Sequence, residues 1–151
     1  MSRPLILVSN DDGITSKGIL TLVNIMKELG DVLVVAPDSP QSGMGHAITV
    51  GESLRLEENF IFEGVKAYEC SGTPADCVKI ARHFVLKGQR QSDVVVSGIN
   101  HGSNTSISVL YSGTMSAAIE AAIEGTPAIG FSLSDFSHKA DFSHTEGFVR
   151  K

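Results

Sequence analysis

The sequence predicts an α/β fold with a mainly parallel sheet and helices on both of its faces. Two observations carry this prediction. Short continuous apolar runs, typical of strands buried on both faces, recur along the chain. Between them lie segments whose apolar residues are spaced as on one side of a helix. Strands that alternate with helices form parallel sheets, so the alternation indicates the fold class.

Four apolar runs mark the expected buried strands. They lie at Leu5–Val8, Val32–Ala36, Asp93–Ser97 and Pro127–Leu133. The stretch around residues 47–70 differs, because its apolar and polar residues partly alternate. We expect exposed antiparallel strands there, as a small excursion from the main sheet. These strands are expected at Ile48–Val50, Ser53–Leu56 and Val65–Tyr68.

Three segments with helical spacing connect the strands. The first contains Ile19–Leu29 and the third contains Met115–Ile123. The second begins after Thr73, which suits the N-cap, and Asp76 three residues later completes a variant of the capping box. The apolar stripe of this second helix is expected to face the core. It consists of Cys77, Ile80, Ala81, Phe84 and Val85.

Length and composition exclude several classes of protein. The 151 residues are expected to form one domain, residues 1–151. The net charge of −5 leaves no basic stripe, so no binding to nucleic acid is expected. No apolar run approaches the roughly 20 residues of a membrane span, and the first residues lack a cleavable signal, so we expect a cytoplasmic protein. The two cysteines, Cys70 and Cys77, are interpreted as buried thiols.

Polar loops follow the predicted strands at one edge of the sheet. The first contains the adjacent carboxylates of Asp11 and Asp12, whose repulsion a divalent cation would relieve. A solvated turn explains the same Asp-Gly sequence equally well. The second, Asp38–Gly43, offers a hydroxyl beside a glycine, and the third, Ser97–Asn104, offers amide groups within a long expected loop over residues 98–113.

The segment Tyr111–Thr114 opens the third helix. A helix N-terminus preceded by Ser-Gly favours an anion such as phosphate, although an ordinary N-cap fits as well. Taken together, the loops predict a metal-assisted phosphoryl site. All of its ligands are oxygens, which favours Mg²⁺ or Mn²⁺ over zinc.

Five motifs, in this order along the chain, resemble the survival protein SurE family. They are Ser-Asn-Asp-Asp-Gly at residues 9–13, Val-Ala-Pro-Asp with Ser-Gly at 35–43, Ser-Gly-Thr-Pro-Ala-Asp-Cys at 71–77, Ser-Gly-Ile-Asn with Gly102 and Asn104 at 97–104, and Tyr-Ser-Gly-Thr at 111–114. The resemblance implies a Rossmann-like fold and a phosphoric monoester hydrolase that cleaves nucleoside 5′-monophosphates. It also implies one divalent metal ion, Mg²⁺ or Mn²⁺, and a homo-oligomer, a dimer or tetramer.

The resemblance assigns roles to ten residues. Asp11 and Asp12 would be catalytic and, with Ser42 and Asn100, would bind the metal, which would activate the attacking water. The phosphate would be surrounded by Asn10, Gly43, Asn104, Ser112, Gly113 and Thr114. Two loop histidines, His101 and His46, are candidates for donating the leaving-group proton, although a histidine on a loop surface is the more common case.

Other interpretations compete with the phosphatase. Members of this family are longer and continue with further strands and an extended arm, so the resemblance implies that this chain is the N-terminal part of a longer fold. A domain that binds metal and phosphate without turnover is therefore the main alternative. A dinucleotide-binding domain would need Gly-x-Gly-x-x-Gly after the first strand, and a haloacid-dehalogenase type of phosphatase would need Asp-x-Asp. The Asn-Asp-Asp-Gly turn fits neither pattern.

Overall fold

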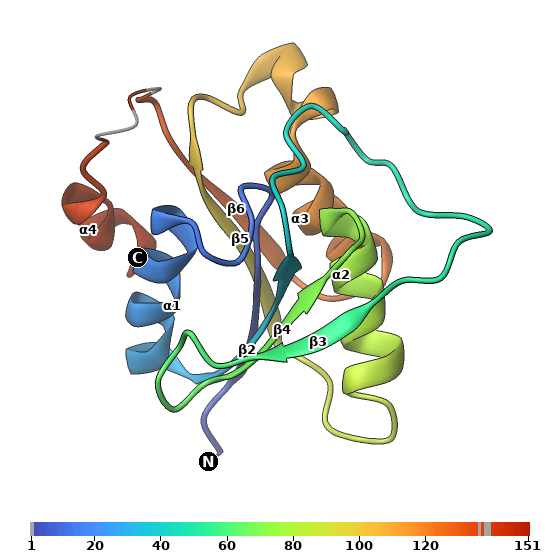
Figure 1. The fold of residues 1–151 in the computed structure, drawn as a ribbon. Helices are drawn as coiled ribbons and strands as arrows, with labels where there is room; N and C mark the ends of the chain where they lie inside the picture. The colour runs from blue at the N-terminus through green and yellow to red at the C-terminus, as the bar shows by residue number, and fades with distance from the viewer. Residues whose placement is uncertain (1, 136, 138–139) are drawn as a thin grey trace.

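A computed structural model describes residues 2–135, 137 and 140–151. One six-stranded sheet runs through it in the order β3-β4-β2-β1-β5-β6 (Figure 1). All neighbouring pairs are parallel except β3 with β4. The α/β class with a mainly parallel sheet is thus confirmed. The strands are β1 (Leu5–Ser9), β2 (Asp31–Pro37), β3 (Leu56–Asn59), β4 (Lys66–Cys70), β5 (Val94–His101) and β6 (Ala128–Leu133).

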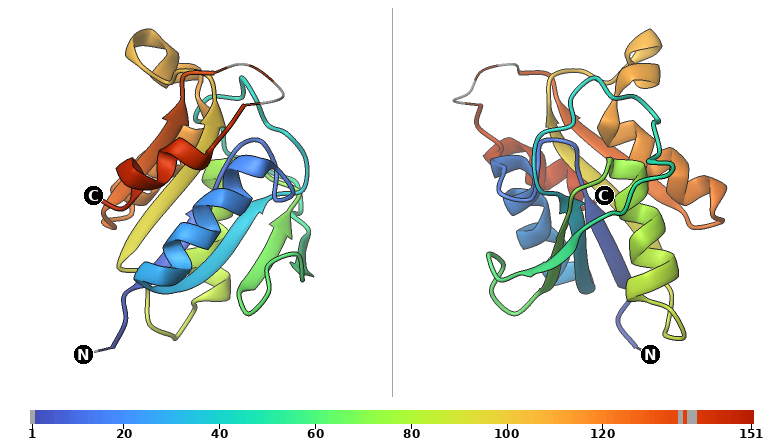
Figure 2. Two further views of the ribbon diagram at one scale, coloured as in Figure 1. Left: turned by 90° about the vertical axis from the view of Figure 1, so that its left-hand side faces the viewer. Right: turned by 45° about the vertical axis from the view of Figure 1, so that its right-hand side comes forward.

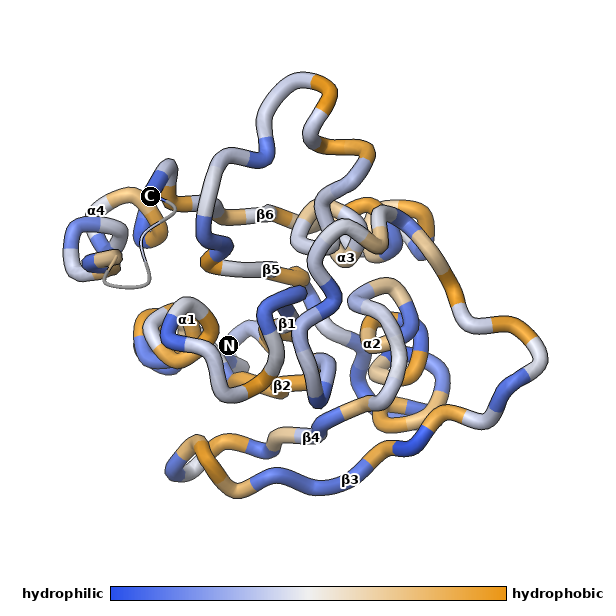
Figure 3. The backbone as a smooth tube through the Cα atoms, turned by 45° about the horizontal axis from the view of Figure 1, so that its top comes forward, coloured by the Kyte–Doolittle hydropathy of each residue, from blue (hydrophilic) through white to orange (hydrophobic). Residues whose placement is uncertain are grey.

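Helices cover both faces of the sheet, as expected. One face carries α1 and α4, which lie side by side, and the opposite face carries α2 and α3 (Figures 2 and 3). Short 3₁₀ turns, η2 (Ser106–Tyr111) and η3 (Ser143–Thr145), complete the connections. The helices are α1 (Lys17–Leu29), α2 (Pro74–Ile80), α3 (Gly113–Ile123) and α4 (Glu146–Val149). Over the described residues, no helix combines the length and apolar character needed to cross a membrane.

The continuous apolar runs fill a core on each side of the sheet. In β1, Ile6 and Val8 pack against the α1 side, whereas Leu7 packs against the α2 and α3 side. Successive side chains of a strand point to opposite faces, so only a run without polar interruptions can satisfy both cores. Both cysteines lie in the core on the α2 side as free thiols, as predicted.

The expected excursion around residues 47–70 is only partly right. β4 lies within the main sheet, parallel to β2, and β3 is the single antiparallel strand at the edge. The expected strand at Ile48–Val50 is wrong, and the Thr49 backbone N–H donates instead to the Asp76 carboxylate of α2 at 3.0 Å. The strand expected from Ser53 begins only at Leu56, where pairing with β4 becomes available.

The capping box at the start of α2 is confirmed. The Thr73 hydroxyl accepts from the Asp76 backbone N–H at 3.2 Å, and the Asp76 carboxylate accepts from the Thr73 N–H at 2.9 Å. The predicted apolar stripe fails at Phe84, which is 72% exposed. The chain passes there into a π-helical turn, η1 (Ala81–Val85), whose wider spacing turns Phe84 away from the core while Val85 still packs against it.

β5 continues past Ser97 into the segment expected to be a loop. After an irregularity in its pairing, Asn100 and His101 pair with Ser132 and Leu133 of β6. The extension brings the backbone of Ile99 against α1 at Gly18. A β-carbon added at Gly18 would lie 1.9 Å from the Ile99 carbonyl oxygen. Only glycine permits this approach, which holds the α1 helix against the strand that carries Asn100.

Substituting Gly18→Ala should therefore destabilise the fold. Because backbone atoms must shift to admit the methyl group, we expect a loss of about 2–3 kcal/mol of unfolding free energy. Urea unfolding followed by circular dichroism measures this loss. Gly147→Ala is the matched control, since a β-carbon there meets nothing within 4 Å and the helix α4 tolerates alanine. Equal stability of Gly18→Ala and wild type would contradict the packing described here.

Candidate active site

A polar cavity of about 270 Å³ opens at the edge of the sheet where the parallel strands end. Such edges are where open α/β sheets form their sites, because successive loops converge there. Loops after β1, β2 and β5 contribute to its wall, and η2 and the start of α3 close it. The lining residues are Asp11, Ser42, Gly43, Asn100, His101, Ser103, Asn104, Ser108, Tyr111 and Ser112.

Asp11 is the most deeply set charged residue of the cavity wall, at 4% exposure. The hydroxyl of Thr114, in the first turn of α3, donates to its Oδ1. Gly113 makes this contact possible, because a β-carbon at that position would lie 2.5 Å from the Asp11 side chain. The N-terminal end of α3 is thereby held directly against the carboxylate that follows β1.

Asp12 lies beside the cavity without lining it. The nearby backbone N–H of His101 acts to lower the pKa of the Asp12 carboxyl group. Its Oδ2 is buried and has no hydrogen-bond partner among the described residues. A buried carboxylate oxygen without a partner is costly, so this atom is one to which a cation would be attracted.

Burial disfavours the charge on both carboxylates. It raises the pKa of Asp11, the hydrogen bond from Thr114 opposes the rise, and the charge of Asp12 adds to it. Burial also raises the pKa of Asp12, against the lowering influence of His101. Two neighbouring acids that are penalised for ionising are an arrangement that a divalent cation stabilises.

Asn10 supports the turn after β1 instead of lining the cavity. Its side-chain amide donates to the Gly13 carbonyl at 2.8 Å and to the Ser16 hydroxyl at 2.9 Å. Its Oδ1 is buried without a hydrogen-bond partner in the described part of the chain. The expectation that Asn10 contacts phosphate stays a prediction.

The loop after β2 brings Ser42 and Gly43 to the cavity. It is attached to the first loop by the Gln41 backbone N–H, which donates to the Asp11 carbonyl oxygen at 2.7 Å. This bond places the hydroxyl-bearing residue next to the carboxylate loop, although the two are about 30 residues apart in the sequence.

The end of β5 supplies the amide side chains. The Asn100 amide nitrogen donates to the Asn104 Oδ1 and to the Gly102 carbonyl, both at 3.2 Å. Asn104 in turn donates to the Ser132 hydroxyl of β6 at 2.7 Å. These bonds employ the amide nitrogen of Asn100, and its oxygen is the atom suited to a hard cation.

Ser112 is the N-cap of α3. Its hydroxyl accepts from the Met115 backbone N–H at 3.0 Å, so the interpretation as an N-cap is confirmed. The same N-terminus borders the cavity, so the helix dipole points its positive end toward any anion bound there. For the segment Tyr111–Thr114, the N-cap interpretation and the anion-binding interpretation are therefore compatible.

The structure brings six of the ten predicted site residues to one cavity wall. These are Asp11, Ser42, Gly43, Asn100, Asn104 and Ser112. Asn10, Asp12, Gly113 and Thr114 are placed beside or behind it. Sequence reasoning gave no role to Ser103 or Ser108, which lie in segments rich in small polar residues without a distinguishing signal. Of the two candidate histidines, His101 lines the cavity and His46 does not.

The donor set fits a hard divalent cation. Within the described residues, no three His, Cys, Asp or Glu side chains gather as a metal cluster. A cation here would therefore combine the two carboxylates with hydroxyl and amide oxygens. The buried Asp12 Oδ2 without a partner is the observation that supports such a fit.

Comparison with known proteins agrees with these features. The family model described as survival protein SurE matches residues 6–151. A relative from Cytophaga hutchinsonii, named 5′-nucleotidase SurE, is 73% identical over 151 residues, covering 100% of this chain and 58% of that protein. A relative of the same name from Christiangramia forsetii is 66% identical over 150 residues, covering 98% of this chain and 57% of that protein.

A solved structure shares the fold. The crystal structure of the SurE protein from Aquifex aeolicus matches with a TM-score of 0.83 and 39% identity, over 97% of this chain and 57% of that one. The chain thus spans somewhat more than half the length of the curated relatives it matches. The match over residues 6–151 includes every loop of the cavity. The chain belongs to the survival protein SurE family.

Proposed function

We propose that this chain carries the metal and phosphate site of a phosphatase that hydrolyses nucleoside 5′-monophosphates. The observation that carries the proposal is one polar cavity that has the buried Asp11 in its wall, the half-buried Asp12 beside it and the N-terminal end of α3 at its border. The name 5′-nucleotidase printed for its relatives supports the choice of substrate. Membership of the SurE family supports a homo-oligomer, which stays a proposal.

One divalent ion, Mg²⁺ or Mn²⁺, would be held by Asp11, Asp12, Ser42 and Asn100. When bound, such an ion polarises a phosphoryl oxygen and lowers the pKa of a water molecule. The chain's own groups supply the remaining functions. The N–H groups at the start of α3, with Gly43 and Asn104 beside them, would bind and orient the phosphate.

Proton movements fall to side chains around the cavity. Asp12 is suited to orient or deprotonate the attacking water, because burial leaves its carboxylate more basic than usual. The Asp11 carboxylate is held by the Thr114 hydroxyl, so Asp11 is better suited to bind the metal than to act as a base. His101 lines the cavity, so it is better placed than His46 to donate the proton that the leaving ribose oxygen needs.

Asp11→Asn should abolish metal-dependent turnover. The measurement is phosphate release from a panel of nucleoside 5′-monophosphates by this chain, with Mn²⁺, with Mg²⁺ and with EDTA. We expect release with metal and none with EDTA, and a loss of at least about 100-fold in the variant, because removing one carboxylate ligand costs a few kcal/mol of transition-state stabilisation.

Asp31→Asn is the matched control for that measurement, since this carboxylate is exposed at the start of β2, away from the cavity. Wild-type release by Asp11→Asn would refute the assignment. A wild-type chain that shows a Mn²⁺-dependent thermal shift without releasing phosphate would instead support the alternative, a binding domain without turnover.

Asp12→Asn should stabilise the metal-free protein at neutral pH. Folding raises the pKa of Asp12, so its contribution to stability is present below the unfolded-state pKa and is lost as the pH rises through the folded-state pKa. In EDTA at about pH 7, the variant should melt about 2–4 °C above wild type, and the gain should shrink toward about pH 4.

Calorimetric melting curves at several pH values measure this difference. Added Mn²⁺ should raise the melting temperature of wild type and leave that of Asp12→Asn unchanged, because the variant lacks a ligand. The exposed Asp31→Asn should follow wild type throughout. A variant that melts below wild type in EDTA at neutral pH would show that the Asp12 charge is already satisfied without a cation.

A further inference from the structure

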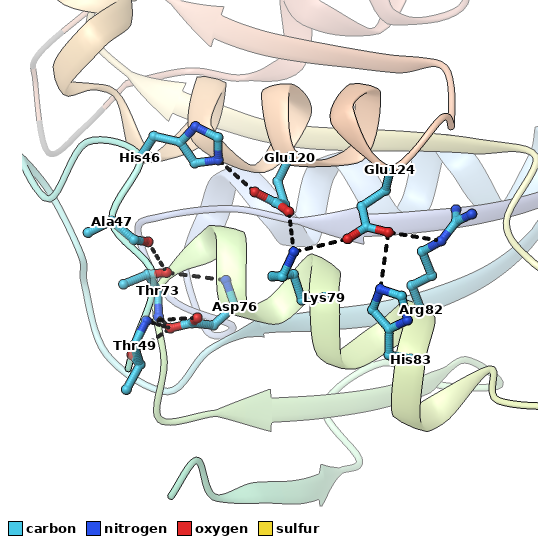
Figure 4. Close-up of polar contacts among 10 residues, drawn as sticks. All are labelled: His46, Ala47, Thr49, Thr73, Asp76, Lys79, Arg82, His83, Glu120 and Glu124. Carbon is cyan, nitrogen blue, oxygen red and sulfur yellow. Dashed lines mark hydrogen bonds and ion pairs between the residues drawn. The ribbon is translucent and has the colours of Figure 1, made fainter. Parts of the chain in front are cut away.

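A buried carboxylate links three separate elements of the fold (Figure 4). Glu120 of α3 is only 4% exposed. Its Oε1 accepts from the Lys79 ammonium of α2 at 2.7 Å, and its Oε2 contacts the His46 Nε2 at 2.8 Å. Glutamates are rarely buried unless they are paired, so both contacts are needed to keep this one inside.

The two oxygens of Glu120 serve different purposes. Lys79 also binds Glu124, one turn further along α3, at 3.0 Å, so the contacts of Lys79 join the two helices. His46 belongs to neither helix. It lies in the long loop between β2 and β3, four residues after Ser42. The His46–Glu120 contact therefore attaches this loop to α3.

The loop is also attached to α2 immediately after His46. The Thr73 hydroxyl donates to the Ala47 carbonyl at 2.7 Å, and the Thr49 hydroxyl and N–H donate to the Asp76 carboxylate at 2.7 and 3.0 Å (Figure 4). From His46 to Thr49, the loop is thus attached to the helices that cover one face of the sheet.

The segment just before His46 has one internal backbone bond, from the Met44 N–H to the Gln41 carbonyl at 3.3 Å. It starts at Gln41, whose N–H is bonded to the Asp11 carbonyl. It contains two glycines with positive φ, Gly43 at 79° and Gly45 at 58°. A β-carbon at Gly45 would lie 2.9 Å from the Leu110 carbonyl, so the segment also runs close to η2. Residues 42–45 therefore form a short span between two fixed ends, Gln41 and His46.

We propose that His46 is a positioning residue, which holds Ser42 and Gly43 in place at the cavity by binding Glu120. The inference rests on the proposed function, because it takes Ser42 as a metal ligand. Glu120 lies on the same helix whose N-terminal end borders the cavity. One rigid helix thereby fixes both the anion-binding end of the site and the loop with the hydroxyl ligand. Fixing a ligand before the metal arrives saves the entropy of ordering it.

The test compares Mn²⁺ binding and backbone exchange in wild type and His46→Ala. Calorimetric titration with Mn²⁺ alone requires no turnover. We expect about tenfold weaker binding in the variant, the size of effect typical for the loss of a residue that orients a metal ligand. Hydrogen–deuterium exchange of the metal-free protein should be faster over residues 42–45. His46→Gln, whose amide can still donate to Glu120, should restore most of both properties.

His83→Ala is the matched control, because His83 makes the same kind of contact, 3.0 Å to Glu124, at the far end of the network (Figure 4). It should leave Mn²⁺ affinity and exchange over residues 42–45 unchanged. Unchanged exchange in His46→Ala would overturn the inference, and so would faster exchange with unaltered Mn²⁺ affinity. Absence of Mn²⁺ binding by wild type would contradict the proposed function instead, and the exchange measurement would still decide whether His46 holds the loop.

Discussion

The bond from the Thr114 hydroxyl to the Asp11 carboxylate joins the start of α3 to the end of β1, across 103 residues of sequence. Most other features of the site depend on this junction. Gly113 is needed because any side chain there would collide with Asp11. The Gln41 bond then attaches the second loop to the backbone of the same aspartate. One acidic residue thereby organises the helix end and two loops into a single cavity wall.

The two carboxylates of this wall lower the stability of the fold, although they suit the proposed binding of a cation. Asp11 and Asp12 are adjacent, and burial penalises the charge of each. The Oδ2 of Asp12, which has no hydrogen-bond partner among the described residues, adds to this cost. Sites that must bind a cation strongly are built in this way, because the energy withheld from the metal-free state is recovered on binding.

The buried strands and the capped start of α2 follow from the sequence, because local patterns determine them. An unbroken apolar run such as Leu5–Val8 has one structural explanation, and Thr73 and Asp76 satisfy each other three residues apart. The convergence of Asp11, Ser42 and Asn100 also follows, since loops after parallel strands share an edge. The segment Ile48–Val50 was not predictable, because its backbone partner is the side chain of Asp76 on a later helix.

The His46–Glu120 contact shows why the attachment of the loop after β2 could not be predicted from the sequence. A single acid within an apolar helical stripe gives no local sign of a partner 74 residues away. Such long-range contacts nevertheless determine the positions of the loops. Loops make most of the cavity wall, and the loop after β2 is attached to Asp76 of α2 and Glu120 of α3, which do not line the cavity themselves. If His46 positions Ser42 as proposed, substitutions on these helices should weaken metal binding while the sheet and its core remain intact.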